Sequence, residues 1–251
     1  QAHWSANKQH NVVDLPPELD AYYQRMIDDI DDRCVEVINV MLFVCRPVSL
    51  AELSVILGWD ECDDIDWKKI ISACGSFLTL QPDWRTPNDN VPVEESQNTT
   101  VNFVHTSAKD FILKQRESEQ GFVQLTHQAI AERLLSYMTN RLRRNFYGLC
   151  NPAYSMTDLV RPDPDPLEPF RYACVYWTEH LSKAQVAVHE RDVVAAVGEF
   201  LRRRSLNWIE ALSLTKEISA GITTLRTLHH LLEVGKHAIS TLMQCLSMIR
   251  N

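Results

Sequence analysis

The sequence predicts a mainly α-helical fold that contains one small β-hairpin. Glycine is scarce, with 7 residues among 251, so the chain has little material for tight turns or Gly-rich phosphate-binding loops. Apolar residues recur at helical spacing over most of the chain, whereas only residues 77–80 and 100–105 have the character of strands. The composition, 45% hydrophobic and 23% charged, is typical of a globular protein with a packed core.

Two helices are predicted before residue 48. The first begins within residues 14–18, where prolines and acidic side chains occupy favoured positions of a first helical turn, and it runs to about Asp31. The second ends at Arg46-Pro47, because proline disfavours helix at the residue before it. Its buried face is marked by residues at i, i+4, i+7, i+8 and i+11: Cys34, Ile38, Met41, Leu42 and Cys45.

Two shorter helices follow. Ser49 and Glu52 have the spacing of a capping box, in which each side chain bonds the backbone of the other residue. Gly58 supplies the stop of this third helix. The fourth helix covers about residues 65–74 and ends at Gly75.

A β-hairpin with a long polar loop comes next. Residues 77–80 and 100–105 are the predicted strands, and residues 82–98 between them are rich in Pro, Asn, Asp, Glu and Ser. A further helix is expected at residues 106–114. Helix–turn–helix followed by strand, polar loop and strand is the order of a winged helix with a small β-hairpin wing.

The remainder of the chain predicts an all-α helical domain. We assign residues 1–11 to the end of an upstream region, residues 12–118 to the winged-helix domain and residues 119–251 to the helical domain. Its Pro-rich loop, residues 150–169, is unsuited to helix. The expected helices are 127–138, 170–183, 186–203 and 206–214, followed by a helical tail over 216–250 with a break at Gly235.

The sequence contains no recognisable enzymatic or metal-binding motif. Neither G-x-x-x-x-G-K-S/T nor G-x-G-x-x-G occurs, so the chain by itself is not expected to hold a nucleotide tightly. No G-x-S-x-G motif marks a nucleophile. The adjacent pair His229-His230 would point apart on a helix, which is unsuitable for a shared metal. We therefore predict no catalytic residue, no metal and no cofactor within this chain.

Charge argues against nucleic acid and membrane partners. The net charge of −8 opposes binding to nucleic acid and to anionic membranes. The predicted recognition helix and wing carry Lys68, Lys69 and Arg85 among acidic residues at 60, 61, 63, 64, 83, 89, 94 and 95. The longest apolar stretch, residues 35–45, is too short to span a bilayer. Seven singly scattered cysteines indicate a reducing compartment, so the prediction is a cytoplasmic protein.

His105 is the candidate site residue. Alternating apolar residues at 101–104 lead into it, and a helix begins at Thr106. At such a strand–helix junction a ring nitrogen can reach a neighbouring domain. A single histidine in this position can also be purely structural, and the pattern leaves both interpretations open.

Five motifs, in order along residues 12–230, carry a family resemblance. They are Leu15-Pro16-Pro17-Glu18-Leu19, Arg46 to Leu53, Phe103 to Phe111, Pro169 to Ala173 and Phe200 to Ser213. Together they resemble the region that follows the NACHT nucleotide-binding domain in fungal NOD-like (STAND) proteins. In that family a NACHT domain is followed by a winged helix, a helical region and then WD, ankyrin or tetratricopeptide repeats.

The resemblance implies a non-catalytic regulatory fragment of a fungal signalling ATPase that acts in innate immunity and heterokaryon incompatibility. ADP or ATP would be held by the upstream NACHT domain, and that domain and the downstream repeats would be partners in cis. Activation of the parent protein would form a homo-oligomer. His105 matches the strand-end histidine that can contact the ADP phosphate in such switches. Plant relatives have Met-His-Asp there, whereas this chain has Val104-His105-Thr106 and lacks the Asp.

Two other functions remain open from the residues alone. The first alternative is a free-standing protein–protein interaction adaptor, which a phosphate loop upstream in the parent gene would exclude. The second is a winged-helix DNA-binding protein, which a salt-dependent DNA shift assay would detect.

Overall fold

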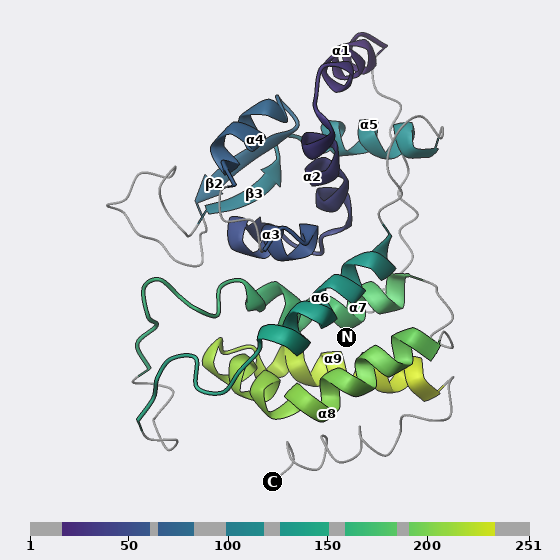
Figure 1. Cartoon of the computed structure of the whole chain (residues 1–251). Coiled ribbons are helices and arrows are strands. Elements are labelled where there is room, and N and C mark those ends of the chain that lie inside the picture. Colours follow the sequence, from purple (N-terminus) through teal and green to yellow (C-terminus); the bar gives the residue numbers. More distant parts are fainter. Residues whose placement is uncertain are drawn as a thin grey trace, which may run out of the picture.

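The helices and strands of the computed structural model form two stacked groups (Figure 1). The model describes residues 17–60, 65–82, 99–117, 126–150, 159–184 and 191–233. The upper group in Figure 1 contains α1 to α5 and a small sheet, and the lower group contains α6 to α9. The described part of the chain is therefore mainly helical, as predicted.

The first group has the order of a winged helix. Its elements are α1 (Pro17–Asp28), α2 (Asp32–Phe43), β1 (Val48–Ser49), α3 (Leu50–Leu57), α4 (Trp67–Ala73), β2 (Leu78–Pro82), β3 (Thr99–Phe103) and α5 (Thr106–Glu117). The three strands form an antiparallel sheet in the order β1-β3-β2. The wing loop at residues 83–98 lies outside the described residues.

Strand β1 was not predicted from the sequence. Val48 pairs with Val101 and Ser49 with Thr100, so β1 occupies the edge of β3 that the hairpin leaves open. Two residues are too few to show the alternation by which a strand is recognised. This strand forms because the edge of β3 is available to it.

Local signals set most of the helix ends. The capping box is present as predicted: the Ser49 side chain accepts from the Glu52 N–H, and the Glu52 side chain accepts from the Ser49 N–H. Gly58 ends α3 in the left-handed region at φ 75°, where a residue without Cβ avoids strain. Helix α1 ends earlier than predicted, at Asp28, because the Asp31 side chain caps α2 by accepting from Cys34 N–H at 2.8 Å.

The second group consists of α6 (His127–Arg141), α7 (Phe170–Lys183), α8 (Arg191–Leu214) and α9 (Ile218–Glu233). The prediction of two helices at 186–203 and 206–214 was wrong where the structure can be compared, because α8 is continuous from residue 191. Arg204 Nε donates to Thr139 O at 2.8 Å, and Trp208 Nε1 donates to Cys174 O at 2.9 Å. These bonds hold both parts of α8 on α6 and α7, and no Gly or Pro interrupts it between them. The predicted break at Gly235 lies outside the described residues, as do residues 1–11.

One cluster of buried apolar side chains runs through both groups. Helix α3 of the winged helix packs against α6 and α7, so the two groups share an extended interface. Among the described residues, no helix has the length and apolar character needed to cross a bilayer.

Candidate functional site

The structure places His105 on the surface, in the connection between β3 and α5. Its side chain is exposed, and the neighbouring Val104 is 52% exposed. The Val104 N–H donates to Phe77 O at 3.0 Å, which fixes the chain just before the histidine. The prediction of a histidine at a strand–helix junction is therefore confirmed.

One nitrogen of the His105 ring is bonded and the other is open. Nδ1 accepts from the Ser107 N–H at 3.1 Å and lies 2.7 Å from Ser107 Oγ. Ser107 Oγ is 2.9 Å from the hydroxyl of Tyr23 on α1. Within the described residues we find no hydrogen-bond partner for Nε2. The ring is thus held from one side, and its outer nitrogen is available to an approaching group.

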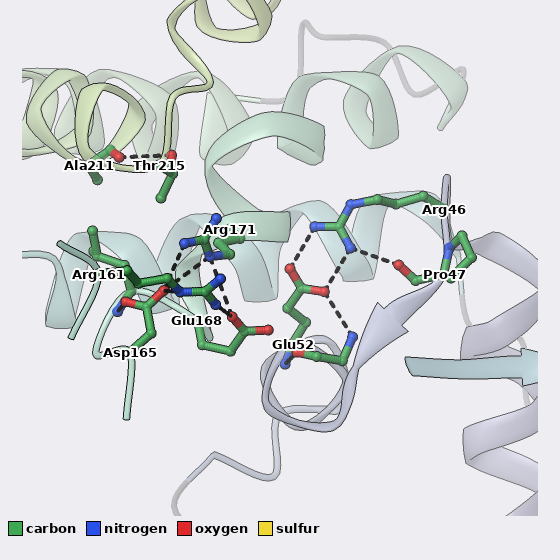
Figure 2. A network of polar contacts seen from close by, with 11 residues as sticks. Arg46, Pro47, Glu52, Arg161, Asp165, Glu168, Arg171, Ala211 and Thr215 are labelled. Carbon is green, nitrogen blue, oxygen red and sulfur yellow. Dashed lines mark hydrogen bonds and ion pairs between the residues drawn. The ribbon is translucent and has the colours of Figure 1, made fainter. Parts of the chain in front are cut away.

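A second candidate site lies between the winged helix and the helical group. We call it the joint, and it consists of the polar contacts that link residues 36–60 to residues 127–180. At its centre Arg46 holds Glu52 by two hydrogen bonds, of 2.6 and 2.8 Å (Figure 2). The Glu52 side chain is 0% exposed. The Arg46 guanidinium also lies over the rings of Tyr172 and Tyr176 on α7, 5.2 and 5.6 Å from their centroids.

The charge of Arg46 is secured by this arrangement. Burial would lower the pKa of Arg46, but the hydrogen bonds and negative charge of Glu52 outweigh burial and raise it. A buried ion pair with two hydrogen bonds defines a geometry closely, because any displacement leaves a charge unpaired in a poorly solvated place.

A cluster of two acids and two arginines flanks this pair in Figure 2. Arg161 and Arg171 bond both Asp165 and Glu168, at 2.8 to 3.4 Å. For Asp165 burial acts to raise the pKa, but the hydrogen bond with Arg171 and the two arginine charges lower it overall. For Glu168 burial and the charge of Glu52 raise the pKa, against the bonds to Ser49 and the arginines. The carboxylates of Glu52 and Glu168 therefore repel each other electrostatically across the joint.

A chain of hydrogen bonds forms the other part of the joint. The Cys45 N–H donates to Tyr172 OH at 3.0 Å, and this hydroxyl lies 2.7 Å from His180 Nε2. His180 Nδ1 is 2.9 Å from Nδ1 of His127, the first residue of α6, and the His127 ring meets Phe43 edge-on. Burial, with the nearby His127 and Lys183, lowers the pKa of His180 to about 3, so the ring is neutral.

The joint continues along α6. Arg133 Nη1 donates to Ile56 O at 3.1 Å and lies 3.7 Å from Glu36 Oε1. Arg141 pairs with Asp60 at 3.3 Å. Asp60, Arg133 and Arg141 line an open cavity of about 400 Å³ between α3 and α6. Arg141, the last residue of α6, is therefore an interdomain contact.

Sequence reasoning missed most of the joint. Arg46 was interpreted only as part of a helix stop, and His127 and His180 only as helix residues. The one signal in the sequence that could have found it is the helical spacing of Tyr172, Tyr176 and Trp177, which is typical of packing within a core or between domains. Among the described residues, no group of three or more Cys, His, Asp or Glu side chains is placed to hold a metal ion.

Fold and sites together define a class: a winged helix joined through a buried polar joint to a helical group, with His105 exposed between β3 and α5. The chain is homologous to vegetative incompatibility protein HET-E-1 of Podospora anserina, to which it is 32% identical over 255 residues. The match covers 90% of this chain but 18% of the relative, so the chain spans only a small part of that protein. No family model matches the sequence, and no solved structure matches it.

Proposed function

We propose that this chain is the non-catalytic regulatory part of a fungal NACHT/STAND signalling ATPase. It would lie between a NACHT domain that holds ADP or ATP and C-terminal repeats, in a cytoplasmic protein that self-associates when activated. The chain would stabilise the inactive, ADP-bound form and relay the nucleotide state. The observation that carries the proposal is the joint, because it couples the winged helix to the helical group.

The joint supports the relay. Buried ion pairs and hydrogen bonds have few alternative geometries, so a movement of the winged helix is transmitted to α6 and α7 instead of being absorbed between them. Arg46, Arg133 and Arg141 make contacts at separate points of this interface. Several separated contacts resist rotation better than one.

His105 supports the sensing step. An exposed ring nitrogen without a partner among the described residues can bond a phosphate oxygen of a nucleotide held by another domain. Such a bond would favour the closed, ADP-bound arrangement, and exchange for ATP would shift the population toward an open, associating form. The homologous relative is named for vegetative incompatibility, a response in keeping with self/non-self recognition.

The decisive experiment is His105→Leu in the full-length protein. We expect less ADP retained after purification and a larger share of oligomer, measured by nucleotide extraction and light scattering. His230→Leu is the matched control, since His230 is an exposed histidine on α9, away from the β3–α5 connection. Equal ADP content and equal mass for His105→Leu and wild type would overturn the proposal.

A further inference from the structure

We infer that Ser107 and Tyr23 fix the His105 ring as its Nε2–H tautomer, so that the open nitrogen is a hydrogen-bond donor for a phosphate-type oxygen. The use of this donor for a nucleotide rests on the proposed function, whereas the tautomer and its cause do not.

The backbone bond between Ser107 and His105 can have only one direction. The Ser107 N–H lies 3.1 Å from His105 Nδ1, and an amide N–H can only donate. Nδ1 therefore presents its lone pair. Because a neutral imidazole carries one proton, that proton is on Nε2.

The unprotonated Nδ1 also sets the direction of the bonds made by the Ser107 and Tyr23 hydroxyls. Since Nδ1 carries no proton, the Ser107 hydroxyl, 2.7 Å away, donates to it. The Ser107 oxygen then accepts from Tyr23 OH at 2.9 Å. Tyr23 is only 6% exposed, and its ring packs on Phe77 and Phe111 at 5.4 and 5.3 Å between centroids. The whole chain of bonds therefore points outward, from α1 through Ser107 to His105.

The Ser107 N–H also disfavours a proton on Nδ1. A proton on Nδ1 would face the Ser107 N–H, a second donor, and would break the bond that caps the start of α5. The arrangement thus keeps Nδ1 as an acceptor and Nε2 as a fixed donor. Such a donor suits an acceptor such as a phosphate oxygen and gives no bond to an ammonium group.

This chain of bonds also makes α1 part of the site. Helix α1 is held on α5 by Lys114 with Asp20 at 3.0 Å and by Gln115 with Gln24 at 2.8 Å. Displacement of α1 would withdraw the Tyr23 hydroxyl and loosen the His105 ring. The position of α1 therefore regulates how well His105 is oriented.

The tautomer is measured directly by two-bond ¹H–¹⁵N correlation of the histidine rings in the 251-residue chain, at a pH where His105 is neutral. The His105 signals are assigned by their loss in His105→Gln. We expect wild-type Nδ1 to resonate as an unprotonated nitrogen and Nε2 as a protonated one. A wild-type ring protonated on Nδ1, or an equal mixture of both tautomers, would overturn the inference.

Variants test the cause. In Ser107→Ala the Nδ1 resonance should move toward that of a tautomer mixture, and Ser107→Thr, which keeps the hydroxyl, should restore it. Tyr23→Phe keeps the packed ring and should give a smaller shift in the same direction. Thr106→Ala, one residue away, is the control and should give none. An unchanged His105 spectrum in both Ser107→Ala and Tyr23→Phe would refute the roles of these side chains.

Nucleotide exchange in the full-length protein separates this inference from the proposed function. Ser107→Ala should release ADP about two- to tenfold faster, the range expected for a weakened hydrogen bond. If His105→Leu leaves ADP retention unchanged, the proposed function fails while the tautomer result stands. If His105→Leu accelerates release but Ser107→Ala and Tyr23→Phe do not, the positioning roles fail and the proposed function stands.

Discussion

The two candidate sites differ in how much of their hydrogen-bonding capacity is used. At the joint, Glu52 is fully buried and engaged by Arg46, and Tyr172 OH has a partner on each side. At the β3–α5 connection, His105 is exposed, and within the described part of the chain only its inner nitrogen has a hydrogen-bond partner. A site whose polar groups are already paired fixes the relative position of the elements that carry them. A site with an unpaired donor can bind a further hydrogen-bond acceptor. Under the proposed function, the joint would transmit the movement and His105 would recognise the nucleotide.

The largest effect that would sharpen this comparison is expected for Glu52→Ala. The substitution leaves Arg46 without its buried partner and removes the capping box, so unfolding should become easier by about 3–5 kcal/mol. Urea unfolding of the chain followed by circular dichroism measures this change. Glu36→Ala is the control, because Glu36 and Arg133 also meet across the joint but are about one-third exposed. The control should change the free energy of unfolding by less than ~1 kcal/mol. Equal effects of both substitutions would contradict a central role for Glu52.

A smaller loss is expected for Tyr172→Phe. The substitution keeps the ring under Arg46 but leaves the Cys45 N–H and the His180 ring without the hydroxyl, which should lower stability by about 1–3 kcal/mol. Tyr176→Phe is the matched control, since Tyr176 lies under the same guanidinium but is only partly buried. If both variants unfold alike, the hydroxyl of Tyr172 does not contribute to the joint.

The joint should also make stability depend on pH. The pKa of His180 falls from 6.5 to about 3 on folding, so the unfolded chain binds a proton that the folded chain excludes. The contribution of this residue is therefore complete above about pH 6.5 and is lost progressively as the pH falls toward 3. The slope approaches about 1.4 kcal/mol per pH unit within this window. Urea unfolding between about pH 7 and pH 5 measures it. A His180→Gln variant should show a shallower slope, and an identical slope would assign the effect to other groups.

Features caused by interactions between close neighbours in the sequence could be predicted, whereas features caused by interactions between distant residues could not. The capping box of Ser49 and Glu52 and the stop at Gly58 were predicted, because their causes lie within a few neighbouring residues. The role of Glu52 in the joint could not be predicted from the sequence. It depends on Arg46 being turned toward Tyr172 and on the approach of Glu168 from a distant segment. Neighbours in sequence predict a helix end, but only the folded chain brings those charges together.

The same reasoning explains the errors in the strands and helices. Strand β1 forms only because β3 offers an open edge to Val48. A strand of two residues has no sequence pattern that would predict this pairing. Helix α8 continues past Ser205, where the sequence predicted a gap, because its neighbours hold Arg204 and Trp208 on either side. For His105 the sequence correctly indicated the junction. It gave no sign of Ser107 and Tyr23, because the second of these lies on another helix.

The smallest effect is expected at the recognition end, for the stability of His105→Ala. The ring caps the start of α5 through one partly buried backbone bond, so its loss should lower the free energy of unfolding by only ~0.5 kcal/mol. Asp31→Ala removes a comparable cap, on the more buried α2, and should lower it by ~1 kcal/mol. The two variants are compared by urea unfolding at neutral pH. A loss of more than ~2 kcal/mol for His105→Ala would make this histidine a structural residue. A near-neutral effect on folding, together with altered ADP retention in the full-length protein, would show that its outer nitrogen is reserved for binding.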